Sequence, residues 1–175
     1  MIGSTSTRND ELLVTEAGHA RLRAELDALT GEGRRELAER VRAARADGHL
    51  ADNPELFEAL EEQTLLEWRI ALLETQLAGA RIADGRSTDG AASIGARVRL
   101  LELGSGETFE YDLVGAIEAD PVAGRISVDS PVGRALDGHA AGEVVAVETP
   151  RGLVQLELLA VAPAGAGVES LRDAA

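Results

Sequence analysis

The sequence predicts an α+β fold, in which an antiparallel α-helical coiled-coil hairpin is followed by a small β-rich domain. Two successive patterns of apolar residues along the chain predict it. Between Thr15 and Ile82 the apolar residues recur at spacings of three and four, the period of an α-helix. From Ser93 onward they alternate with polar residues, the period of a β-strand. Residues 83–93, between the two patterns, are small and polar, so we expect a flexible linker there.

The helical half consists of two arms that meet in the stretch ADGHLADNPEL, residues 46–56. Thr15 is a good N-cap for the first arm, whose apolar pattern is interrupted by GEG at 31–33. The second arm, predicted from Pro54 to Ile82, carries a continuous apolar seam that is polar only at Gln63.

The two seams predict how the arms pair. When the chain is folded at Leu50, Ala44 lies opposite Leu56, and Val41 lies opposite Ala59 or Leu60. Because the seams meet in register, we expect the hairpin to close within one chain. The alternative is a coiled coil between two chains, which the turn-forming residues at the bend disfavour.

Five strands and one short helix are predicted in the second half of the chain. Pro131 opens the helix and Gly138 ends it, and TPRG at 149–152 joins the last two strands as a hairpin. The strands are expected at 96–103, 108–114, 125–130, 143–148 and 153–161. The chain then divides into a disordered start (1–11), the hairpin (12–82, tip at 47–55), the linker (83–93), the β-rich domain (94–162) and a flexible tail (163–175).

The composition excludes several classes of site and partner. The net charge is −14 and all 17 basic residues are arginine, so nucleic acid and anionic membranes repel the chain in bulk. The absence of cysteine excludes disulfides and thiolate metal sites. The sequence shows no signal peptide and no apolar run long enough for a membrane helix, so we expect a cytoplasmic protein. We also expect the protein to be a monomer.

Three stretches of the sequence resemble the Gre family of transcription elongation factors (GreA and GreB). They are LLVTEAGHARLRAELDAL at 12–29, RADGHLADNPEL…EEQ at 45–63, and RISVDSPVGRALDGHAAGEVVAVETPRG at 125–152. The last of them is the most specific, and the similarity extends over residues 12–162.

This resemblance implies a fold, a partner and a chemistry. The β-rich domain would be FKBP-like and would dock on the rim of the secondary channel of bacterial RNA polymerase, while the hairpin enters the channel. Acidic residues at the tip would help the polymerase to hold a second Mg²⁺ and to cut the RNA 3′ end of a backtracked complex. The protein itself would be no enzyme and would have no cofactor of its own. Members of the family are also classed as DNA-binding.

The tip departs from the family's pattern at two positions. By resemblance, His49 stands where the family has Asp, and Asp52 stands where the family has Glu. An imidazole is a poor Mg²⁺ ligand, whereas carboxylate oxygens are good ones. Asp52 is therefore the candidate catalytic carboxylate, and it would bind metal only in complex with the polymerase; Asp47 and Glu55 are candidate substitutes. The structural alternative is that Asp52, or Asn53 beside it, caps the second arm.

Two further groups of residues are candidates for binding. Ser130, Pro131 and Val132 fall in the segment with which the family contacts the polymerase, although a plain strand-to-helix transition would also explain them. The basic residues of the hairpin cluster in its first arm, and a solvated helix face is their simplest explanation. Among them, Arg42 and Arg45 are the candidates for RNA contact. The cluster consists of Arg34, Arg35, Arg40, Arg42 and Arg45.

The sequence thus predicts a Gre-family regulator of elongation that binds RNA polymerase through its secondary channel. The altered tip predicts that stimulation of transcript cleavage is weakened or lost. The alternative is an inhibitor that occupies the channel, or a competitor of true cleavage factors. Two alternatives belong to other functional classes, namely a structural coiled-coil adaptor and an FKBP-like peptide-binding module. The aromatic content of 2% disfavours the peptide-binding module, because such sites are usually lined by aromatic side chains.

Overall fold

The structure is a computed structural model that describes residues 12–46, 53–83, 90–149 and 152–163. The chain divides into two compact units, one formed by residues 19–80 and the other by the residues on both sides of them. The predicted α+β class, with a helical hairpin and a β-rich part, is confirmed. The predicted disordered start (1–11), most of the predicted linker and nearly all of the predicted tail lie outside the described residues.

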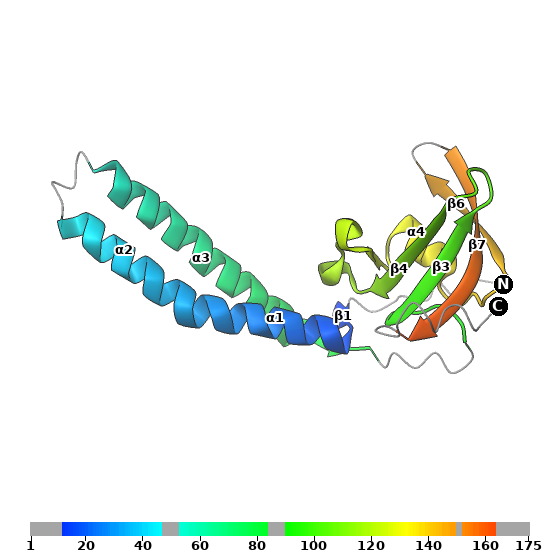
Figure 1. Cartoon of the computed structure of the whole chain (residues 1–175). Coiled ribbons are helices and arrows are strands. Elements are labelled where there is room, and N and C mark those ends of the chain that lie inside the picture. The colour runs from blue at the N-terminus through cyan, green and yellow to red at the C-terminus, as the bar shows by residue number, and fades with distance from the viewer. Residues whose placement is uncertain (1–11, 47–52, 84–89, 150–151, 164–175) are drawn as a thin grey trace, which may run out of the picture. The chain divides into compact units, whose positions relative to one another are not determined.

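The first arm of the hairpin is helical throughout. Helix α1 (Glu16–Ala28) passes into a π-helical turn, η1 (Leu29–Gly33), and then into α2 (Arg34–Ala46) (Figure 1). The GEG stretch that interrupts the pattern therefore widens the helix without ending it. A π turn holds one residue more than an α turn, so it accommodates one extra residue between the two parts of the apolar pattern. After it, Leu37, Val41 and Ala44 are again on the buried face.

The second arm is the single helix α3 (Pro54–Gly79), which runs beside α2 (Figure 1). Val41, Ala44, Leu56 and Ala59 form one buried cluster at the end nearest the bend. This agrees with the predicted register, in which Ala44 faces Leu56 and Val41 faces Ala59 or Leu60, and Leu60 packs against the same cluster.

The second arm of the hairpin ends three residues earlier than predicted. The helix was expected to run to Ile82, but Ala80–Ile82 is the strand β2, which pairs in a two-stranded sheet with β1 (Leu12–Val14), the segment just before the Thr15 cap. The helix α3 ends at Gly79 because Ala80 already has an extended backbone, with φ −74° and ψ 136°. The Ala83 N–H continues the pairing by donating to the Val14 carbonyl at 2.8 Å.

A buried carboxylate holds the start of α1. Glu118 is 6% exposed, and its Oε2 accepts hydrogen bonds from the backbone N–H groups of Thr15 at 2.7 Å and Gly115 at 3.2 Å. The Thr15 hydroxyl donates to Oε1 at 2.5 Å and accepts from the Gly18 N–H at 2.9 Å, so Thr15 caps α1 as predicted. A methyl group at Gly18 would overlap the Glu118 carboxylate, which explains a glycine in the first turn of the helix.

The β-rich unit contains a five-stranded sheet in the order β5-β4-β3-β7-β6. Neighbouring strands are antiparallel except for the parallel pair β4 and β5. Two short 3₁₀ turns, η3 (Ala116–Glu118) and η4 (Pro121–Ala123), connect β4 to β5. The other elements are β3 (Ala96–Glu102), β4 (Thr108–Val114), β5 (Arg125–Ser127), the helix α4 (Pro131–Leu136), β6 (Val144–Thr149) and β7 (Gly152–Pro163).

The third of the five predicted strands in chain order is shorter than predicted. Residues 125–130 were expected to be extended, but β5 ends at Ser127. The reason is Ser130, whose hydroxyl donates to the Ser127 carbonyl at 2.6 Å and accepts from the Gly133 N–H at 3.0 Å. These two hydrogen bonds turn the chain out of the strand and cap α4.

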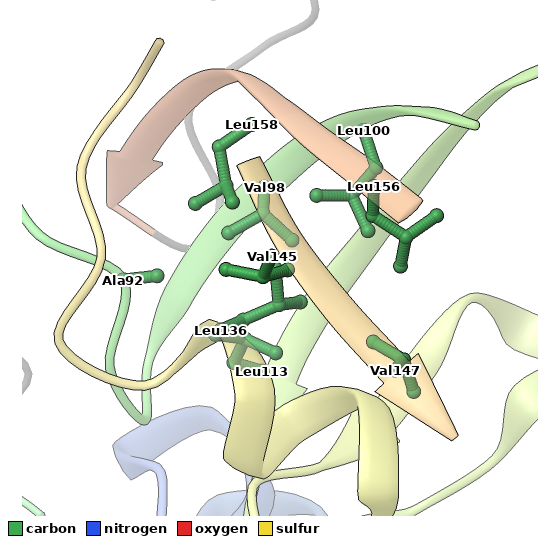
Figure 2. Packing of buried hydrophobic residues seen from close by; sticks show 9 residues of the cluster. All are labelled: Ala92, Val98, Leu100, Leu113, Leu136, Val145, Val147, Leu156 and Leu158. Atoms are coloured by element: carbon green, nitrogen blue, oxygen red, sulfur yellow. The ribbon is translucent and has the colours of Figure 1, made fainter. Parts of the chain in front are cut away.

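The core of the β-rich unit is aliphatic, as the low aromatic content predicts. Leu136 of α4 points among residues of the sheet, with Leu113 and Val145 beside it (Figure 2). The cluster consists of Ala92, Val98, Leu100, Leu113, Leu136, Val145, Val147, Leu156 and Leu158. All nine are 7% exposed or less, so this unit has a closed core of its own.

Candidate functional site

Asn53 closes the hairpin directly behind the tip. Its side-chain oxygen accepts a hydrogen bond from the Leu56 N–H at 3.1 Å, which caps α3, and Pro54 follows at the first helical position. Its Nδ2 group donates to the Ala44 carbonyl at 2.6 Å, near the end of α2. One side chain therefore satisfies backbone groups at both helix ends. Because Asn53 provides the cap of α3, capping no longer explains why an Asp stands at position 52 of the sequence.

The tip residues themselves lie outside the described residues. This applies to Asp47, His49 and Asp52, whose predicted roles stay predictions. Glu55 is described: it lies in the first turn of α3 with an exposed side chain, where a carboxylate is favoured by the positive end of the helix. Among the residues that the structure describes, no group of three or more His, Asp and Glu side chains is arranged to hold a metal ion.

Ion pairs between described residues join the two arms of the hairpin. The Arg34 guanidinium donates to both Glu67 oxygens, at 2.9 Å from Nε and 2.7 Å from Nη2. Arg40 pairs in the same two-pronged way with Glu62. Nearer the start of α1, Glu25 accepts from Nε of Arg69 at 2.7 Å. The sequence analysis did not predict these ion pairs. The signal for them was present, because Arg residues on one arm stand opposite Glu residues on the other when the arms are paired.

The ion pairs shift the pKa values of the residues that form them. The hydrogen bond from Arg34 holds the pKa of the Glu67 carboxyl below its ordinary value, and the same contact raises the pKa of Arg34. Likewise, the hydrogen bond to Glu62 raises the pKa of Arg40. Both pairs are exposed to solvent, so they contribute to register more than to stability.

The basic cluster of the first arm is thereby divided in two. Arg34 and Arg40 are engaged across the hairpin, and Arg35 pairs with Glu32 on its own arm. Arg42 and Arg45 are exposed and have no ion pair among the described residues. Because Arg45 lies in the last turn of α2, this available positive charge sits at the tip end of the arm.

The three candidate partner-binding residues have different environments in the structure. The Ser130 hydroxyl is used within the chain as the cap of α4, and Val132 packs against the core of the β-rich unit. Pro131 is exposed at the start of α4. Of the three, Pro131 is thus the residue whose side chain is most available to a partner.

Two family models match the chain and together span most of it. Residues 12–82 match the model described as "Transcription elongation factor, N-terminal", and residues 87–163 match "Transcription elongation factor, GreA/GreB, C-term". The first match thus covers the helical hairpin, and the second covers the β-rich part of the chain that follows it. The chain belongs to the GreA/GreB family of transcription elongation factors, as its sequence predicted.

Several relatives are similar to the chain over nearly their whole length. Transcription elongation factor GreA of Clostridioides difficile (strain 630) is 42% identical over 154 residues, 87% of this chain and 97% of that protein. The factor of the same name from Thermoanaerobacter pseudethanolicus is 40% identical over 151 residues, 86% of this chain and 96% of its own. Among solved structures, the GreA factor homolog 1 protein of Thermus thermophilus is 30% identical, with 87% of this chain and 99% of that one covered and a TM-score of 0.39.

Proposed function

We propose that the protein binds bacterial RNA polymerase through its secondary channel and regulates elongation with weakened or absent stimulation of transcript cleavage. The observation that carries this proposal is His49, which stands at the tip where the resemblance to the family implies an Asp. Membership in the family, and relatives named transcription elongation factors, support the polymerase as partner.

The expected weakness follows from metal chemistry. Phosphodiester cleavage by two metal ions needs the second Mg²⁺ held beside the scissile phosphate, with carboxylate oxygens and water as ligands. With His49 in place of a carboxylate, Asp52 remains as the tip's principal ligand. In this proposal the protein is no enzyme: the polymerase carries out the hydrolysis, and the Mg²⁺ is shared with its active site.

The hairpin suits the role of a stalk that presents this tip. Asn53 fixes the two helix ends to each other, and the ion pairs of Arg34 and Arg40 with α3 hold the register farther down. Arg42 and Arg45 would lie beside the extruded RNA 3′ end and attract its phosphates. The segment of Ser130, Pro131 and Val132 would contact the channel rim, with Pro131 as its exposed residue.

A second candidate function is favoured by the same His49. A factor that enters the channel but recruits the second Mg²⁺ poorly would act as an inhibitor, or as a competitor of true cleavage factors. The two candidates differ in one observable. A weak stimulator raises cleavage above the level of polymerase alone, whereas an occupant that does not cleave lowers the stimulation given by another Gre factor.

The experiment is a pull-down of core RNA polymerase followed by cleavage of labelled RNA in a backtracked complex. We expect binding by the natural chain, weakened binding by Pro131→Arg, and cleavage near the level of polymerase alone. Substituting Ser130 or Val132 would be less informative, because both support the fold. Absence of binding would refute the proposed partner, and strong cleavage would refute the proposed weakness.

A further inference from the structure

The five-stranded sheet of the β-rich unit has two edges that differ in length. One edge is β5, which has three residues, and the other is β6, which has six. Natural proteins protect an exposed edge strand by keeping it short, by placing lysine or proline in it, or by a bulge. The strand β6 contains neither lysine nor proline, and it pairs with β7 without a register shift. The protection that β5 has through its shortness is therefore missing at β6.

The backbone of β6 presents hydrogen-bonding groups at this free edge. Just before the strand, the Glu143 carbonyl accepts from the Leu158 N–H at 2.9 Å. Hydrogen-bonded residues alternate along an antiparallel strand, so Val145 and Val147 bond to β7 in the same way. The residues whose N–H and C=O groups point to the free edge are Val144, Ala146 and Glu148.

These three residues also have exposed side chains, on the face of the sheet opposite the core. Val144 is 50% exposed, whereas Val145 and Val147 point into the core (Figure 2) and are 6% and 2% exposed. No turn, loop or side-chain hydrogen bond between described residues involves the backbone of Val144, Ala146 or Glu148. The edge thus offers a run of free donors and acceptors to an incoming extended strand.

The sequence of β6 is complementary to itself in the antiparallel direction. With Ala146 on a two-fold axis, Val144 lies opposite Glu148 of a second copy, and all three edge residues of both strands form hydrogen-bonded pairs, with about six hydrogen bonds. The residue that meets its own equivalent is a small alanine. The only charged side chain of the strand, Glu148, faces a valine and not another carboxylate.

We propose that the free edge of β6 pairs with β6 of a second copy of the chain, forming a weak two-fold dimer. Each chain contributes one short strand, so the contact is much smaller than a stable dimer interface, and the net charge of −14 on each chain opposes it. The dimer should form reversibly at a concentration of about 0.1 mM and tighten as salt screens the repulsion. Single copies predominate at lower concentration. The inference does not depend on the proposed function.

Single cysteines test the pairing directly, because the chain has no cysteine of its own. In the proposed register Ala146 lies opposite its own equivalent, at a Cα separation of about 5.5 Å that a disulfide can span. Under mild oxidation, we expect Ala146→Cys to form disulfide dimers about tenfold faster than the control Val122→Cys, whose side chain is 100% exposed on η4. Equal rates for the two variants would overturn the inference.

A mixture of two variants tests the register. Val144→Cys and Glu148→Cys lie opposite each other in the two copies, so each should cross-link to the other faster than to itself. An equal mixture should therefore give mainly the mixed dimer, which mass spectrometry resolves. A statistical distribution of products would overturn the proposed pairing.

Analytical ultracentrifugation tests the backbone hydrogen bonds without a disulfide. Val144→Pro removes an N–H that points to the free edge, at the first position of the strand, where proline is compatible with a sheet. Val144→Thr keeps this N–H and is the matched control. We expect self-association to be lost in the proline variant and kept in the control, with similar thermal unfolding of both. As a second variant, Ala146→Lys places like charges opposite each other on the axis and should also abolish association.

Salt and polymerase binding distinguish the occupants of the edge. Raising the salt from about 0.05 M to about 0.5 M should tighten self-association of the natural chain about threefold or more. A natural chain that stays monomeric at about 1 mM would overturn the inference and leave the proposed function intact. Association that neither Val144→Pro nor Ala146→Lys changes would place the contact elsewhere, with the same consequence. If these variants instead weaken polymerase binding and the natural chain does not self-associate, the polymerase is the occupant and the inference is wrong.

Discussion

The hairpin and the β-rich unit are stabilised in different ways. The β-rich unit surrounds one closed cluster of nine aliphatic residues, from both a helix and a sheet. In the hairpin, α3 buries a single line of four residues, and the flanks are joined by exposed ion pairs. A closed core responds little to pH and salt, whereas exposed charges respond to both. The hairpin is thus the half of the molecule that solution conditions can tune.

The largest effect is expected from the closed core. Leu158→Ala removes a side chain that is fully buried on β7, and the cavity left behind should lower the free energy of unfolding of the β-rich unit by about 2–5 kcal/mol. Chemical denaturation followed by circular dichroism measures it. Leu153→Ala on the same strand is the matched control and should cost less than about 0.5 kcal/mol. Equal costs for the two variants would mean that the core is not closed.

The next effect concerns the carboxylate that holds the start of α1. Glu118→Ala leaves the N–H groups of Thr15 and Gly115 without their acceptor, and should destabilise the chain by about 1–3 kcal/mol. Hydrogen exchange at these two amides should accelerate together. If exchange at Thr15 stays slow in the variant, Glu118 does not hold the helix.

A double-mutant cycle with Gly18 sharpens this test. In the natural chain Gly18→Ala should be destabilising, because the new methyl group overlaps the Glu118 carboxylate. In the Glu118→Ala background the same change should stabilise by about 0.5–1 kcal/mol, because alanine is the better helix former. A change of sign between the two backgrounds is the predicted result, and the same sign in both would contradict it.

A smaller effect of opposite direction is expected in the hairpin's π turn. Gly31 lies in η1 with open space around the position of a side chain, so neither crowding nor backbone conformation requires glycine there. Gly31→Ala should therefore raise the free energy of unfolding by about 0.5–1 kcal/mol. Thermal unfolding followed by far-ultraviolet circular dichroism measures the gain. A loss of stability would show that the π turn needs glycine for its shape.

The smallest effect is the response of the hairpin to acid. The pKa of Glu67 is lowered by Arg34 in the folded state, so the pair stabilises the hairpin above the ordinary pKa of glutamate. This contribution is lost as the pH falls through the lowered pKa. Melting temperature as a function of pH should therefore fall less steeply in Glu67→Gln than in the natural chain. The difference should shrink at high salt, and an unchanged pH profile would show that the pair contributes nothing.

The hairpin could be predicted because its signal is long and periodic. The seam of α3 repeats over the whole helix, so the pairing of Val41 with Ala59 follows from the sequence alone. The strands β1 and β2 have only three residues each, too few for a period to appear. Their conformation depends on the contact of Ala83 with Val14, between residues far apart in the chain.

The candidate site was predictable in part, for similar reasons. The sequence offered Asp52 and Asn53 equally as the cap of α3, and the hydrogen bond from the Leu56 N–H to the Asn53 side-chain oxygen decides between them. Ser130 was recognised as a boundary residue, but its two hydrogen bonds depend on where Ser127 and Gly133 lie in the fold. Glu118 gave no warning at all, since a lone Glu in a short loop is normally exposed.

The most direct test of the account is transcript cleavage by the chain with its tip carboxylate restored. In a backtracked complex with labelled RNA, His49→Asp should raise the cleavage rate, most of all at low Mg²⁺, where binding of the second ion limits the reaction. Asp52→Ala in the restored background should abolish the gain. If the natural chain already cleaves well and His49→Asp changes nothing, His49 is not a lost ligand, and Asp47 or Glu55 supplies the second carboxylate.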